Sequence, residues 1–145
     1  MKYISTRSKE KEYSFGEVFL KGLADDGGLY VPKSVKKYNS AELSKLKKLN
    51  YNELSTEIIN QFLGDFISKE ELLSLIIKSY STFREKEVVK ISNVGGIKLL
   101  ELFHGPTLAF KDIAMQFIGN LYEYYLGKND KKINIVVATS GDTGA

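Results

Sequence analysis

Apolar residues recur along the first 82 residues at the spacing of short amphipathic helices, and three of these segments begin with a capping pair. In each pair a Ser or Asn stands three residues before a Glu, and apolar residues follow. The pairs are Ser14 with Glu17, Asn50 with Glu53, and Ser68 with Glu71. A fourth helix, short and basic, is expected over residues 41–49. The Asp-Asp-Gly-Gly cluster at residues 25–28 marks a turn before an extended segment.

The pattern changes after residue 82. Residues 88–91 and 97–102 are rich in apolar side chains and flank a turn through residues 93–96, which predicts a hairpin. The apolar stretch at residues 108–126 is too long for a strand, and we expect a mostly buried helix there. The β-branched run at residues 133–138 is typical of a central parallel strand covered on both faces. A helix followed by a buried strand indicates an α/β domain.

These elements predict a mixed α/β fold with two parts. Residues 1–85 are expected to form a helical N-terminal domain, and residues 86–145 the beginning of an open α/β domain. Residues 1–90 hold 16 of the 21 basic and 13 of the 18 acidic residues, so the second part is expected to be the more buried. A central strand needs neighbours on both edges, and the sequence offers too few strand candidates. We therefore expect a truncated piece of a longer protein.

Composition and charge exclude several classes of function. The net charge of +3 comes from basic and acidic residues mixed along the chain, which does not indicate a nucleic-acid partner. The absence of cysteine excludes disulfides, thiolate metal sites and a cysteine nucleophile. His104 is the single histidine, so a metal centre is not expected. The polar N-terminus and the lack of a run of about 18 uncharged apolar residues favour a cytoplasmic protein with no membrane span.

Lys111 is the first candidate for chemistry. Ala114, Met115 and Ile118 follow it by three, four and seven residues, which puts the lysine on an apolar face of the predicted helix. Burial there would strip water from the ammonium group and favour the neutral amine that Schiff-base formation needs. Alternatively the side chain reaches solvent or pairs with a carboxylate such as Asp112, and spacing alone favours this second interpretation.

The loop at residues 139–144, Thr-Ser-Gly-Asp-Thr-Gly, is the second candidate. It follows the predicted strand, where backbone amides can converge on an anion at the start of a helix. It is neither a nucleotide P-loop nor a dinucleotide fingerprint, because it lacks the residues of both. An ordinary small-residue connection between strand and helix stays an equally open alternative.

The residues before the long helix are expected to have a structural role. His104 and Pro106 are predicted to form its entry turn, with Thr107 as the N-cap. The basic group of Lys45, Lys47 and Lys48 is expected to be a solvated helix face.

Three strings of residues resemble the threonine synthase family. Residues 3–7, Tyr-Ile-Ser-Thr-Arg, resemble the family's opening Tyr-x-Ser-Thr-Arg, although Ser8 replaces the glycine that usually follows. Residues 21–32 resemble its Lys-Gly-Leu-Ala and Asp-Gly-Gly-Leu-Tyr-Val-Pro. Residues 101–112, Glu-Leu-Phe-His-Gly-Pro-Thr-Leu-Ala-Phe-Lys-Asp, match its highly specific cofactor-lysine motif. The resemblance covers nearly the whole chain.

The resemblance implies roles for particular residues in a fold of the tryptophan-synthase-β type. It implies that Lys111 forms a Schiff base with pyridoxal phosphate and that Asp142 lies beside this cofactor. Many relatives in the wider fold type carry an asparagine that contacts the cofactor's phenolic oxygen, and an ionised Asp142 is unable to donate that bond. The residues implied at the substrate carboxylate are Thr139, Ser140, Gly141 and Thr143.

The implied activity is that of a pyridoxal-phosphate-dependent carbon-oxygen lyase, which converts O-phosphohomoserine and water into threonine and phosphate. The family's cofactor-phosphate loop and the residue facing the pyridine nitrogen lie outside these 145 residues, so the chain alone is expected to be inactive. Two alternatives stay open: a related phospholyase that eliminates phosphate without making threonine, and a non-catalytic fragment that keeps the fold. The sequence leaves the oligomeric state undetermined.

Overall fold

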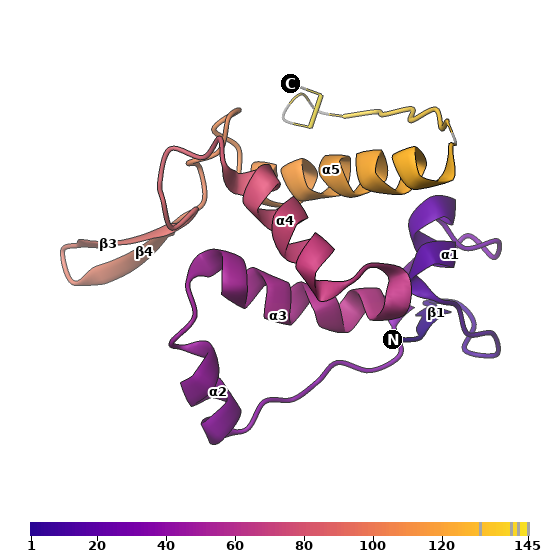
Figure 1. The fold of residues 1–145 in the computed structure, drawn as a ribbon, viewed down its shortest axis with the longest axis horizontal. Helices are drawn as coiled ribbons and strands as arrows, with labels where there is room; N and C mark the ends of the chain where they lie inside the picture. The colour runs from indigo at the N-terminus through magenta and orange to yellow at the C-terminus, as the bar shows by residue number, and fades with distance from the viewer. Residues whose placement is uncertain (131, 140, 142, 145) are drawn as a thin grey trace. The chain divides into compact units, whose positions relative to one another are not determined.

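The computed structural model describes residues 1–130, 132–139, 141, 143 and 144, and shows a mixed helix-and-strand fold as predicted. The chain divides into two compact units, Met1–Leu73 and Ser74–Ala145. The first contains β1 (Tyr3–Ser5), α1 (Phe15–Lys21), β2 (Tyr30–Pro32), α2 (Ser40–Leu46), α3 (Tyr51–Leu63) and the 3₁₀ turn η1 (Gly64–Phe66) (Figure 1). Helix α4 (Lys69–Tyr80) begins in the first unit and ends in the second, which also contains β3 (Lys90–Val94), β4 (Ile97–Glu101) and α5 (Asp112–Asn129).

Aromatic packing organises the first unit. Strands β1 and β2 pair antiparallel, and Tyr3 of β1 lies with its ring centroid 6.1 Å from that of Phe15 on α1. The Phe15 ring lies 5.3 Å from Phe19 and 5.0 Å from Phe66. The Tyr3 hydroxyl also donates a hydrogen bond of 2.8 Å to the carbonyl of Phe62 in α3. Pairs of rings in such geometries contribute about 0.5–1.5 kcal/mol each beyond the area they bury.

The predicted capping pairs are confirmed at all three helices. In α1, α3 and α4 the Ser or Asn side chain accepts a hydrogen bond from the backbone of the Glu three residues on, while that Glu accepts one from the cap. The expected helix at residues 41–49 is α2, but it begins at Ser40 and ends at Leu46. Its cap is Asn39, which forms the same reciprocal pair with Glu42.

A hydrogen-bonded corner joins the ends of β1 and β2. The Asp26 carboxylate accepts hydrogen bonds of 2.8 Å from the backbone N–H of Gly28 and from the hydroxyl of Ser5. The backbone N–H of Leu29 donates to the hydroxyl of Thr6 across the same corner, at 2.9 Å. Residues 3–7 and 21–32, the two N-terminal strings that resemble the family, are thus joined by hydrogen bonds.

Stability of this corner is expected to depend on pH through Asp26. The hydrogen bond from Gly28, and then that from Ser5, hold the pKa of Asp26 below its ordinary value. A group with a lowered pKa stabilises the fold above its unfolded-state pKa, and this contribution is lost as the pH falls through the folded pKa. We therefore expect the first unit to lose stability below about pH 4. Urea unfolding between pH 7 and pH 3 measures this. The free energy of unfolding should fall less steeply with pH in Asp26→Asn than in the wild type, and an equal fall in both proteins would contradict the role of Asp26.

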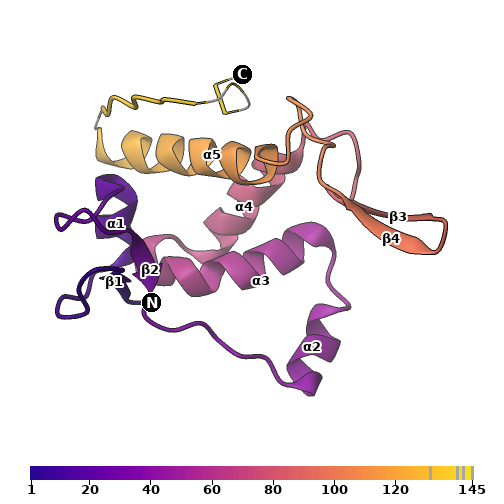
Figure 2. The same cartoon turned by 180° about the vertical axis from the view of Figure 1, so that it is seen from behind.

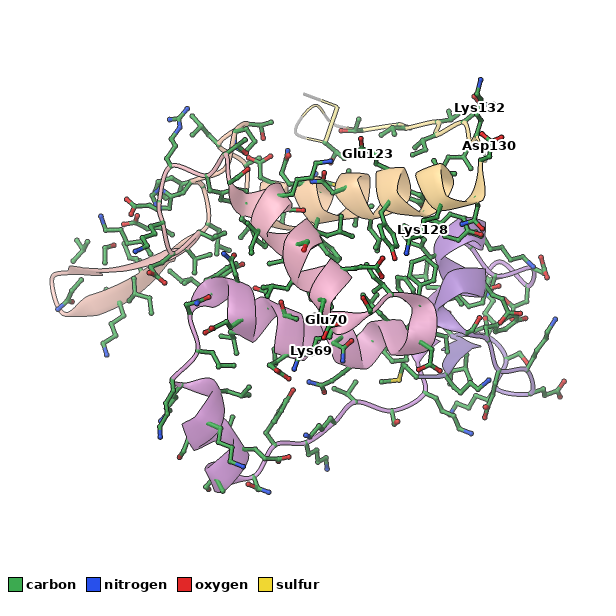
Figure 3. The ribbon with its side chains drawn as sticks, viewed as in Figure 1. Lys69, Glu70, Glu123, Lys128, Asp130 and Lys132 are labelled. Carbon is green, nitrogen blue, oxygen red and sulfur yellow. The ribbon has the colours of Figure 1, made fainter. Side chains whose placement is uncertain are left out.

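Surface charges add little to the same unit. Lys69, labelled in Figure 3, lies in the first turn of α4 and forms an ion pair with Glu57 of α3. Both side chains are substantially exposed. Exposed pairs of this kind contribute about 0–1 kcal/mol because water screens them.

In the second unit the last turns of α4 pack against α5, as Figures 1 and 2 show from opposite sides. The Tyr80 hydroxyl donates a hydrogen bond of 3.0 Å to the carbonyl of Ile113, and the Asn120 amide donates one of 3.1 Å to the hydroxyl of Ser79. Leu121 of α5 is fully buried. At the exposed edge of the same contact Glu123, labelled in Figure 3, forms an ion pair of 2.5 Å with Lys78 of α4.

The predicted hairpin is confirmed; its first strand lies later than expected, and its second begins at the predicted residue and ends one residue earlier. Strands β3 and β4 pair antiparallel from Lys90 opposite Glu101 to Val94 opposite Ile97, and Gly95 and Gly96 form the turn. Residue 88 lies outside the ladder because Val88 is buried with a φ of 63°, which is incompatible with a strand. The hairpin exposes the apolar side chains Ile91, Val94, Ile97, Leu99 and Leu100.

Three expectations for the last 40 residues are wrong. The long helix begins at Asp112, since Leu108 has a left-handed φ of 63° that a helix does not accept. It is not mostly buried, because among its residues only Asp112, Phe117 and Leu121 are buried. Residues 133–138 form no strand and are exposed, since no strand among the described residues supplies a hydrogen-bonding partner. They double back beside α5 toward its first turn (Figures 1 and 2).

Candidate active site around Lys111

Lys111 lies at the N-cap of α5, directly before the first helical residue. Its side chain is half-buried, and its Nζ donates a hydrogen bond of 2.7 Å to the hydroxyl of Thr143. The carboxylate of Asp112, which the sequence offered as a partner for the lysine, is bonded elsewhere. The structure thus brings together one residue from each of the two candidate segments.

The apolar face predicted around Lys111 is present but uncovered. Ala114, Met115 and Ile118 are all exposed. The sequence left burial of this face open, and the structure leaves it exposed, whereas the buried apolar side chains of α5 are Phe117 and Leu121. The amine of Lys111 is bonded to Thr143 of the returning segment, in a part-buried hydrogen bond.

A compact turn leads into the lysine. The expectation that Thr107 is the N-cap of α5 is wrong, because Lys111 occupies that position. Thr107 instead contacts the side chain of Asp112, the first residue of the helix. Both its backbone N–H and its hydroxyl donate to the carboxylate of Asp112, at 2.9 and 2.8 Å. The backbone N–H of Leu108 donates to the carbonyl of Gly105 at 3.2 Å, which closes the turn. The sequence reasoning missed this contact; the signal for it is a Thr that follows Gly-Pro and stands five residues before an Asp.

His104 begins this turn and is fixed by a carboxylate. Its Nε2 lies 2.7 Å from an oxygen of Glu101, and both side chains are mostly buried. Hydrogen bonds from Ser92, and then from His104, lower the pKa of Glu101. Because the ionised carboxylate only accepts hydrogen bonds, Nε2 carries the shared hydrogen. The His104 carbonyl accepts from the backbone N–H of Arg84 at 2.9 Å, so the histidine has the structural role expected.

Two hydrogen bonds join the described residues of the 139–144 loop. The backbone N–H of Gly141 donates to the hydroxyl of Thr139 at 3.0 Å, and that of Gly144 donates to the carbonyl of Gly141 at the same distance. Gly141 has a φ of 126°, a conformation that favours glycine. The predicted site residues Ser140 and Asp142 lie outside the described residues.

The arrangement therefore offers a primary amine at a helix start, held by a hydroxyl from a glycine-containing loop. Within the described ranges no three His, Asp or Glu side chains gather as a metal site would require. No helix in that part of the chain is long and apolar enough to cross a membrane.

Comparison with known proteins gives a consistent result. Residues 2–80 match the family model for the threonine synthase N terminus. Threonine synthase of Schizosaccharomyces pombe is 42% identical, over 99% of this chain and 30% of that protein. Human threonine synthase-like 2 is 37% identical, over 100% of this chain and 30% of that protein. The crystal structure of pyridoxal-phosphate-bound threonine synthase from Brucella melitensis is 38% identical, over 99% of this chain and 31% of that one, with a TM-score of 0.92. The chain spans about 30% of the length of these relatives.

Proposed function

The chain belongs to the threonine synthase family, and from this premise we propose that Lys111 binds pyridoxal phosphate in an enzyme that converts O-phosphohomoserine and water into threonine and phosphate. Relatives bear the name threonine synthase, and a similar solved structure holds this cofactor. We further propose that residues 1–85 form the family's N-terminal helical domain and that residues 86–145 begin its cofactor-binding domain.

The residues present fit pyridoxal phosphate. Its aldehyde condenses with a primary amine, and the Lys111 amine is partly buried, beside the hydroxyl of Thr143 in a loop that contains a glycine turn. Lys111 would hold the cofactor covalently, with Asp142 as the second proposed contact. When bound, the cofactor supplies a conjugated ring that takes up electrons from the carbon next to the substrate's amino group.

The chain's own residues supply attachment, orientation and proton transfer. Lys111 would hold the cofactor covalently through its Nζ, with the aldehyde oxygen lost as water. Once the substrate's amino group has taken its place, the free Lys111 amine would accept and return protons at the substrate carbons. Thr143 lies within hydrogen-bond distance of this amine, so a carboxylate held by the 139–144 loop has its neighbouring carbon close to the base. Thr139, Ser140 and Gly141 complete that proposed carboxylate site.

The contact between Lys111 and Thr143 is the observation that carries this proposal. The test is an assay of the full-length protein with pyridoxal phosphate and O-phosphohomoserine, in which all products are identified. Equal amounts of threonine and phosphate support the proposal. Phosphate with 2-oxobutyrate and ammonia supports the phospholyase alternative, which the similarity to threonine synthase-like 2 keeps open. No phosphate release would favour the non-catalytic alternative.

Thr143 is expected to affect substrate binding more than cofactor binding. Thr143→Val removes the hydroxyl with little change in shape, and loss of a hydrogen bond to a charged group costs about 1.5–3 kcal/mol. The KM for O-phosphohomoserine should therefore rise by roughly ten- to hundredfold, and Ser140→Ala should act in the same direction. Thr143→Ser is the matched control, because it keeps the hydroxyl. Normal substrate affinity with weakened cofactor binding in Thr143→Val would reverse the assigned role.

A further inference from the structure

Asp112 is the one buried carboxylate beside the cofactor lysine in the described part of the chain. It is 3% exposed, and both of its oxygens are bonded to a single residue. Thr107 supplies its backbone N–H to one oxygen at 2.9 Å and its hydroxyl to the other at 2.8 Å. Two hydrogen bonds from one residue fix the distance and the orientation between the start of the turn and the start of α5.

Gly105 closes the other side of this arrangement. A Cβ at residue 105 would lie 2.4 Å from the Cβ and from a carboxylate oxygen of Asp112, so only a glycine allows this approach. The turn therefore packs directly on the Asp112 side chain at Gly105 and is bonded to it at Thr107. Leu108, with its φ of 63°, lies between these two contacts and Lys111. A residue that rarely adopts this conformation needs such support from its surroundings.

Lys111 is held on both sides by this turn and by the helix. Its carbonyl accepts hydrogen bonds from the backbone N–H groups of Ala114 and Met115, at 3.0 and 2.8 Å. The next residue is Asp112, whose side chain is bonded back across the turn. We propose that Asp112 is a positioning residue, which acts through Thr107 and Gly105 to aim the Lys111 amine at the cofactor aldehyde. This inference rests on the proposed function.

A carboxylate suits this role for two physical reasons. It accepts two hydrogen bonds at once, and such bonds to an ionised group are stronger than those between neutral groups. It also lies in the first turn of α5, where the helix dipole favours negative charge. Side chains locked in this way hold a reactive group within the small tolerance that a covalent step requires.

The test separates covalent capture from non-covalent binding in the full-length, cofactor-free protein. Pyridoxal phosphate is added, and capture by Lys111 is followed over time by borohydride reduction and mass measurement of the peptide that contains residue 111. Non-covalent affinity is measured with 4-deoxypyridoxine 5′-phosphate, which has a methyl group in place of the aldehyde. Thr107→Val is the main variant because it removes one hydrogen bond to Asp112 without changing shape. Thr107→Ser is its matched control.

We expect Thr107→Val to slow covalent capture by roughly ten- to hundredfold, with the affinity for the deoxy analogue unchanged and the wild-type rate restored in Thr107→Ser. Asp112→Ala should slow capture at least as much. Capture at the wild-type rate in both variants would overturn the inference. Equal loss of capture and of analogue binding would also overturn it, because that pattern is one of general structural damage. If the wild-type protein binds neither compound, the proposed function fails first, and this inference fails with it.

Discussion

Replacement of Lys111 with alanine in the full-length protein is expected to lower the turnover of O-phosphohomoserine by at least about a thousandfold. The reason is that one amine both attaches the cofactor and relays protons, and either role alone is worth orders of magnitude. The peptide that contains residue 111 should also lose the borohydride-stable cofactor mass. Phosphate release and peptide mass measurement check the two effects independently.

Two controls make this result specific to the amine. Lys111→Arg keeps a positive charge at the same place but offers no amine that condenses with an aldehyde, so it should be as inactive as the alanine variant. Lys98→Ala removes an exposed lysine of β4 and should retain both the activity and the cofactor mass. Retention of the cofactor mass on another lysine in Lys111→Ala, with activity preserved, would refute the assignment of Lys111.

The second large effect is expected in the first unit, where Gly28→Ala should destabilise the corner between β1 and β2. A Cβ at residue 28 would lie 2.3 Å from the hydroxyl oxygen of Ser5, which is bonded to Asp26 and buried. Ser5 has to rotate away, so its hydrogen bond to Asp26 is lost as well. We expect a loss of about 2–4 kcal/mol, the sum of overpacking and one broken buried hydrogen bond. Hydrogen exchange of the backbone amides of residues 3–32 measures it.

Gly119→Ala is the matched glycine control. A Cβ at residue 119 meets no atom within 4 Å, and the residue lies inside α5. Alanine is a better helix former than glycine by about 0.5–1 kcal/mol, so exchange in α5 should slow or stay the same. Faster exchange at residues 3–32 in this variant, or unchanged exchange there in Gly28→Ala, would contradict the steric argument.

The helices of the first unit could be predicted because a capping box depends on only two residue types at a fixed spacing. Ser14, Asn50 and Ser68 each satisfied this rule, and the structure has a helix after each of them. Asn39 with Glu42 obeys the same rule, so the start of α2 was also accessible from the sequence.

The details around Lys111 could not be predicted in the same way. Leucine rarely adopts a left-handed φ, so the conformation of Leu108 could not be predicted from its residue type. This conformation moves the start of α5 from residue 108 to Asp112. The path of residues 132–139 is not encoded in the spacing of their apolar side chains, which are exposed. The contact of Lys111 with Thr143 therefore had no signal in the local pattern.

The contacts around Lys111 also differ in the order in which they are expected to form during folding. Thr107 and Asp112 are five residues apart, and loops of about ten residues close in roughly 10–100 ns. Thr143 is 32 residues from Lys111, so its approach carries a larger loss of chain entropy and follows the formation of α5. We thus expect the turn that carries Lys111 to form before the loop that carries Thr143 packs against the lysine. Variants of Thr107 should then slow folding of this region, whereas variants of Thr143 should mainly speed its unfolding.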